Sequence, residues 1–177
     1  MASGSGTGYL IGAARDLAPV IREGAEEADR ERRLPQRVAR AMAEAGLYRT
    51  SVARAYGGFE ADPVTTTKVI EAVAEADGSA GWNLMIALET GGIASGHMSA
   101  EAGREVFGDP CAIMAGALNP LGRARPVDGG WRVTGRWPFA SGCQNAGWFW
   151  GGSLVLDGDD VVRDASGLPR PLQLVYP

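Results

Sequence analysis

Ser141, Gly142 and Cys143 form a short turn between two apolar, Trp-rich runs in the stretch 135–150, GRWPFASGCQNAGWFW. A serine or cysteine on a sharp turn after a strand is one way to expose a nucleophile. This stretch lacks the Gly-x-Ser-x-Gly pattern of such a turn. The pattern therefore favours a strand corner, in which Ser141 and Gly142 make the turn and Cys143 packs inside. A nucleophile remains the alternative.

His97 is the single histidine of the chain. A Ser-His-Asp triad could be built only around it, and a metal site with several histidines is excluded. It has no acidic or nucleophilic neighbour in the sequence, so we expect an exposed or cap-associated histidine near a helix end. Cys111 and Cys143 lie too far apart for a disulfide framework or a zinc motif. We expect two reduced thiols and no metal.

Two further motifs are ambiguous on their own. The loop 119–126, NPLGRARP, is no phosphate-binding loop, because it lacks a Gly-Lys-Ser/Thr end and a following helix. Trp82, in GSAGWNLM, is expected in the core with its indole N–H bonded to some partner. None of these motifs alone identifies an activity.

The elements that must position these residues change in type near Pro110. Before it, apolar residues recur at three- and four-residue steps, which indicates helices. Helices are expected over 9–33, 35–47, 62–77, 80–98 and 99–109, with Asp62 and Ser99 as N-caps and Gly46 as a C-cap. The segment 80–98 is apolar nearly all round and predicts a central, buried helix.

After Pro110 the pattern is that of strands. Residues 111–118 are an unbroken apolar run, and Asp128-Gly129-Gly130 has the composition of a hairpin turn. The stretch 135–150 is interpreted as a second, Trp-rich hairpin. The order predicts an α+β protein, with a flexible tail over 1–8, a helical domain over 9–109 and a β domain over 110–177. A strand at the very end would leave an open edge, so we expect a piece of a longer protein.

Composition excludes several classes of function. Hydrophobic residues make up 45% and charged residues 21%, which are globular values, and the net charge of -4 argues against nucleic-acid or anionic-membrane partners. The basic cluster at 30–37 has acidic neighbours and predicts a solvated helix end. The chain shows neither a membrane-length apolar run nor a signal peptide, so a cytoplasmic location is expected.

Three segments, taken in order, resemble the acyl-CoA dehydrogenase superfamily. They are DGSAGWNLMI, FGDP and AGALNPLGRARPVDGGWRVTGRWPFASGCQNAGW. The resemblance is greatest to the flavin-dependent monooxygenases of the p-hydroxyphenylacetate and hydroxy-secosteroid hydroxylase kind. It implies a helical N-terminal domain, an antiparallel, barrel-like middle domain that is truncated here, and a four-helix bundle, missing here, that forms a homotetramer.

The resemblance also implies a site for reduced flavin, FMN or FAD, between the middle domain and the bundle. Ser141 would lie beside the flavin ring as the catalytic residue that stabilises its oxygen adduct. The implied flavin-binding residues are Asn119, Leu121, Gly122, Ala124, Ser141, Gly142 and Cys143, and Trp82 and Thr90 would line the substrate pocket. A flavin reductase would supply the reduced flavin, and the substrate would be an aromatic or polycyclic small molecule.

The sequence departs from the family pattern at several positions. Thr90 stands where the phenol hydroxylases have a histidine, and Asn119-Pro120-Leu121 replaces the Thr-Glu-Pro of the dehydrogenases. Gln144 and Asn145 stand where relatives often place His or Asp. We expect part of a two-component monooxygenase. The alternatives are thioester oxidation of the acyl-CoA dehydrogenase kind and a truncated module without a competent site.

Overall fold

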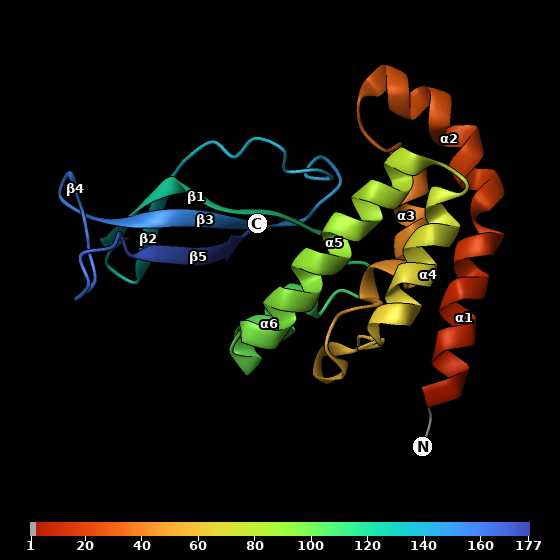
Figure 1. The fold of residues 1–177 in the computed structure, drawn as a ribbon, viewed down its shortest axis with the longest axis horizontal. Coiled ribbons are helices and arrows are strands. Elements are labelled where there is room, and N and C mark those ends of the chain that lie inside the picture. The colour runs from red at the N-terminus through yellow and green to blue at the C-terminus, as the bar shows by residue number, and fades with distance from the viewer. Residues whose placement is uncertain (1–2) are drawn as a thin grey trace.

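The computed structural model describes residues 3–177, and their side chains from residue 8 on. Helices occupy the chain as far as Phe107, and strands begin at Met114 (Figure 1). The helices are α1 (Ser3–Asp16), α2 (Ala18–Glu31), α3 (Gln36–Glu44), α4 (Pro63–Ala74), α5 (Gly78–His97) and α6 (Ala100–Phe107), with 3-10 turns η1 (Leu47–Arg49) and η2 (Arg54–Tyr56). The expected α+β class is confirmed.

Capping side chains set the starts of the later helices. Asp62 accepts hydrogen bonds from the backbone N–H groups of Val64 and Thr65, both at 3.0 Å, and Ser99 accepts one from Ala102 at 3.2 Å. These two predicted N-caps are confirmed, because each oxygen satisfies a backbone donor that has no partner within its helix.

The helix predicted over 9–33 is two helices. Pro19 lies in the first turn of α2, where its missing N–H costs nothing, and the chain bends at Leu17 between α1 and α2. α1 begins at Ser3, inside the segment expected as a flexible tail, and Met1 and Ala2 lie outside the described residues. The domain boundaries at 8 and 109 stay predictions.

α5 lies between α1–α4 and the sheet, where it contacts both α4 and the first strand. Its fully buried Leu84 and Leu88 each contribute about 1.5–3 kcal/mol to the hydrophobic stabilisation. The expectation of burial all round is wrong, because Trp82 is 55% exposed and Ile93 also faces solvent. None of the described helices is both long and apolar enough to cross a membrane.

The strands form one sheet in the order β2-β1-β3-β4, with β5 also paired to β3. They are β1 (Met114–Val127), β2 (Gly130–Thr134), β3 (Trp148–Asp157), β4 (Asp160–Val161) and β5 (Pro171–Tyr176). The predicted hairpin at Asp128-Gly129 is confirmed, since Val127 pairs with Gly130 and Gly129 has a φ of 76°. Closure of the sheet into a barrel stays a prediction.

β1 and β3 are parallel, which corrects the expectation of an antiparallel domain. The physical reason is the segment 135–147, hereafter the site loop. It leaves β2, runs back to the helices and returns to start β3 (Figure 1). Parallel neighbours require such a long crossover. The second hairpin expected over 135–150 is therefore wrong, because both β2 and β3 pair with β1.

Candidate functional site

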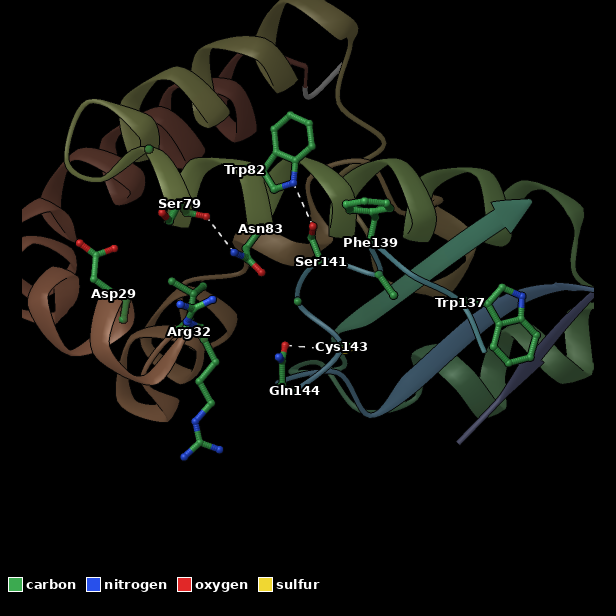
Figure 2. A pocket seen from close by; sticks show the side chains of 16 residues that line it. Asp29, Arg32, Ser79, Trp82, Asn83, Trp137, Phe139, Ser141, Cys143 and Gln144 are labelled. Atoms are coloured by element: carbon green, nitrogen blue, oxygen red, sulfur yellow. Dashed lines mark hydrogen bonds between the residues drawn. The ribbon is translucent and has the colours of Figure 1, made fainter. Parts of the chain in front are cut away.

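A cleft of about 890 Å³ lies where the site loop meets the helices. Its walls are the end of α2 and the turn after it (28–34), the first turns of α5 (78–83) and the site loop (137–144). Of the residues predicted for the site, the structure brings Trp82, Ser141, Gly142 and Cys143 together here (Figure 2).

A hydrogen bond joins the two sides of the cleft. The indole Nε1–H of Trp82 donates to Ser141 Oγ at 3.0 Å (Figure 2). The expectation that Trp82 finds a partner for its N–H is confirmed, but its place in the core is wrong, because the ring lies open to the cleft. The partner is distant in sequence, so no local pattern could identify it.

Ser141 is placed as a hydrogen-bonding group. Its oxygen accepts from Trp82, and no described residue accepts its O–H proton. His97 is at the far end of α5, about 22 Å along the helix from Trp82 at 1.5 Å per residue. Its Nδ1 lies 2.8 Å from the carbonyl oxygen of Ile93. This geometry does not support a serine nucleophile activated by His97.

Gly142 brings the site loop into close approach with α5. Its φ is 81°, and a Cβ at this position would lie 3.0 Å from Asn83 Oδ1. The amide of Asn83 is held by donation from Nδ2 to the carbonyl oxygen of Ser79 at 2.8 Å. Cys143, next in the chain, is exposed, with its thiol 3.7 Å from Gln144 Oε1.

Phe139 is a cleft residue that the sequence analysis missed. It is 95% exposed, and its φ of 61° places a bulky residue in the left-handed region. Such a conformation is rare and costs about 1–3 kcal/mol. Figure 2 shows its ring near Ser141 and Trp82. The aromatic pair in WPF, before the turn, was the signal available in the sequence.

Two arginines at the edge of the cleft were also missed. Arg32 and Arg33 follow α2, and neither forms an ion pair within the described part of the chain. With Asp29 as the acidic residue on the same edge, this side of the cleft is positive. Figure 2 shows the Arg32 side chain directed away from Ser141. The sequence showed a charged helix end but not the surface that it faces.

The predicted flavin-binding residues of β1 do not line this cleft. The β1–β3 register shifts between Ala117 and Gly122, so the residues between them form a bulge on which Asn119 and Leu121 are exposed. Gly122 and Ala124 are buried. Gly122 reaches the cleft only through the ring of Trp137, which packs against it.

Thr90 lies about 12 Å further along α5 than Trp82. It is 8% exposed, and its hydroxyl donates to the carbonyl oxygen of Ile86 at 2.7 Å. Its methyl group packs against Gly116 of β1, where a Cβ would lie 2.9 Å away. The structure thus places Thr90 between α5 and the sheet. Its assignment to a substrate pocket stays a prediction.

Within the residues that the structure describes, no three His, Cys, Asp or Glu side chains gather where they could hold a metal ion. The chemistry available in the cleft is that of aromatic faces, the hydroxyls of Ser79 and Ser141, the side-chain amides of Asn83 and Gln144, backbone groups and a positively charged edge. Such a lining suits a flat, mainly apolar ligand that carries a few polar or anionic groups.

Comparison with known proteins adds a family and several relatives. The model of the acyl-CoA dehydrogenase N-terminal domain matches residues 12–106. The oxygenase subunit HsaA of a flavin-dependent monooxygenase from Rhodococcus jostii is 34% identical over 159 residues, 87% of this chain and 41% of the relative. Indole-3-acetate monooxygenase from Pseudomonas putida is 33% identical over 173 residues, 96% of this chain and 42% of the relative.

Solved structures show the same arrangement. XiaF from Streptomyces sp., in complex with FADH2 and glycerol, superposes with a TM-score of 0.84 at 28% identity. The match covers 99% of this chain and 43% of XiaF. The chain thus spans about two fifths of the length of the proteins that it matches.

Proposed function

Because the chain belongs to the acyl-CoA dehydrogenase N-terminal domain family, we propose that it is part of the oxygenase component of a two-component flavin-dependent monooxygenase. The observation that carries the proposal is the aromatic cleft in which Trp82 holds the hydroxyl of Ser141. Both named relatives are monooxygenases, which supports oxygenation over thioester oxidation.

The cleft residues fit a reduced flavin. An isoalloxazine ring needs flat apolar walls and a few polar contacts at its edge. Trp82 and Phe139 supply exposed rings, Ser141 supplies a donor whose proton no described residue accepts, and Gly142 lets the backbone come close. We propose these four residues, with Cys143, as the flavin contacts of the site loop and α5. Asn119, Leu121, Gly122 and Ala124 remain proposed contacts from β1.

When bound, the reduced flavin supplies the electrons with which O2 is activated. The residues of this chain bind and shield it. Stacked against the bound flavin, the exposed rings of Trp82 and Phe139 would cover part of it from water, which would strengthen the hydrogen bonds that it makes in the cleft. The positive edge formed by Arg32 and Arg33 attracts an anionic ligand such as a flavin phosphate. Ser141 donates a single hydrogen bond to the bound ligand.

The remaining parts of the proposal concern partners. A flavin reductase would deliver the reduced flavin, and the substrate would be an aromatic or polycyclic small molecule with Trp82 and Thr90 near its pocket. The whole protein would contain a closed barrel-like domain and a four-helix bundle and would form a homotetramer in the cytoplasm. HsaA supports the reductase, since it is the oxygenase subunit of a monooxygenase that has more than one component.

Anaerobic titration of the purified chain with FMN and FAD, each chemically reduced, tests the proposal. We expect one of the two to bind, and addition of a flavin reductase, NADH and O2 to give oxygen consumption that an aromatic acid such as indole-3-acetate stimulates. A chain that binds neither flavin at high micromolar concentration would contradict the proposal.

A further inference from the structure

In the hydrogen bond between Trp82 and Ser141, the indole N–H is the donor and the serine oxygen is the acceptor. An indole N–H only donates, whereas a serine hydroxyl has one proton to donate and two lone pairs to accept with. The bond of 3.0 Å from Trp82 Nε1 therefore occupies an acceptor site on Ser141 Oγ and leaves its proton free.

We propose that Trp82 is a positioning residue that fixes the hydroxyl of Ser141 as a donor to the ligand in the cleft. The inference rests on the proposed function, which makes that ligand a flavin. No described residue takes the Ser141 proton, and the backbone N–H of Ser141 is already used by the carbonyl oxygen of Phe139 at 2.9 Å. A hydroxyl that accepts a hydrogen bond is also polarised to donate a stronger one.

The site loop is held in place independently of Trp82. Trp137 Nε1 donates to the carbonyl oxygen of Gly152 at 2.8 Å, before the turn. After the turn, Asn145 Nδ2 donates to the carbonyl oxygen of Leu34 at 3.2 Å and to Gln36 Oε1 at 3.1 Å. These anchors on both sides of Ser141 keep its backbone in place when the indole N–H is removed.

Removal of the indole N–H thus allows the Ser141 hydroxyl to rotate, while the backbone of the site loop stays in place. Without this donor, the Ser141 side chain is free to populate its other staggered rotamers, and its proton no longer has one preferred direction. A ligand must then restrict the hydroxyl on binding, and affinity falls by the free energy of that ordering. This fall in affinity is expected only when Ser141 is present, because Trp82 acts on the ligand through the Ser141 hydroxyl.

A double-mutant cycle tests this dependence. The variants are Trp82→Phe, which keeps an aromatic ring without the N–H, Ser141→Ala, and the two together. Each is titrated anaerobically with reduced FMN and reduced FAD. We expect Trp82→Phe to weaken binding of whichever flavin the unmodified chain prefers by about three- to tenfold. In the Ser141→Ala background we expect the same substitution to change affinity less than twofold.

Trp131→Phe is the matched control, because Trp131 is another exposed indole, 41% exposed on β2 and away from the cleft. We expect it to leave flavin affinity unchanged. Thermal unfolding of each variant checks the fold, and the Trp82 Nε1–H resonance in an ¹⁵N spectrum should move in Ser141→Ala and not in Trp131→Phe.

The outcomes separate the two proposals. Equal losses from Trp82→Phe in both backgrounds, or no loss in either, would overturn the positioning role and leave the flavin site standing. Failure of the unmodified chain to bind either flavin would overturn the proposed function and, with it, the positioning role that depends on it.

Discussion

Gly122 of β1 lies directly against the ring of Trp137 in the site loop. A Cβ on Gly122 would come 2.5 Å from Trp137 Cζ2, far inside van der Waals contact. The indole of Trp137 lines the cleft and packs among Phe149 and Tyr176 of the sheet. Through this contact β1 influences the shape of the cleft, although none of its own residues lines the cleft.

Gly122→Ala should therefore displace Trp137 and also the buried side chain of Ser153, whose Oγ the new Cβ would meet. We expect a loss of about 1–3 kcal/mol in the free energy of unfolding, the usual cost of overpacking, together with weaker flavin binding. Urea unfolding and anaerobic flavin titration measure the two effects. Gly130→Ala is the control, because its Cβ would meet no atom within 4 Å. Equal free energies of unfolding for the two variants would show that the contact between Gly122 and Trp137 tolerates an added methyl group.

Gly142→Ala should act on the cleft through Asn83. The substitution places a side chain at a φ of 81°, which costs about 1–2 kcal/mol, and sets its Cβ against Asn83 Oδ1. Gly129→Ala carries the same backbone strain at a φ of 76° with open space around it. We expect both variants to lose stability in urea and only Gly142→Ala to lose flavin affinity. Loss of affinity in both would implicate backbone strain in general.

Ser141→Ala should lower the coupling of oxygen consumption to product in the proposed oxygenase of which this chain would form part. The variant lacks the hydroxyl that Trp82 positions in the cleft, so we expect the ratio of hydroxylated product to O2 consumed to fall about three- to tenfold, with hydrogen peroxide released instead. Product chromatography with an oxygen electrode measures the ratio. An unchanged ratio would remove Ser141 from the chemistry.

Asp62 should make the stability of the helical part depend on pH. Hydrogen bonds from Thr65, and the backbone N–H of Val64, hold the pKa of the Asp62 carboxyl below its ordinary value. The stabilisation is thus complete above the unfolded pKa of about 3.9 and is lost as pH falls through the lower folded pKa.

Thermal unfolding from pH 7 to pH 2 measures this effect. We expect Asp62→Ala to have a lower Tm than the unmodified chain at pH 7. The difference in Tm between the two should become smaller below about pH 4. Asparagine can cap the helix at every pH because its side chain does not titrate. The difference in Tm between Asp62→Asn and Asp62→Ala should therefore stay the same across this range. A gap between the unmodified chain and Asp62→Ala that does not change with pH would exclude the carboxylate as its cause.

Features that depend on neighbouring residues were predictable from the sequence. The N-caps Asp62 and Ser99 and the Asp128-Gly129 turn each satisfy a local backbone requirement, so residue type was enough. The turn 141–143 made Ser141 a candidate from the sequence alone, whereas its place beside a ligand was implied by the resemblance; the structure places it in the cleft.

Features that depend on distant partners were not predictable. Strand pairing across the site loop decides that 135–147 is a crossover and not a hairpin, and composition carries no record of that pairing. Exposure of Trp82 depends on a loop that begins more than fifty residues later. The place of Arg32 and Arg33 beside the cleft likewise follows from packing, since their own segment shows only a charged helix end.

The parallel pairing of β1 and β3 bears on the order of folding. Contacts within the helices and the β1–β2 hairpin are local, whereas β3 must dock onto β1 after a hairpin and a whole loop have been traversed. Strand pairings that close long loops form late, because the chain loses the entropy of loop closure before the new contacts stabilise it. The site loop is bracketed by that pairing. The capacity to bind ligand should then return only in the slowest phase of refolding, after helical circular dichroism has recovered.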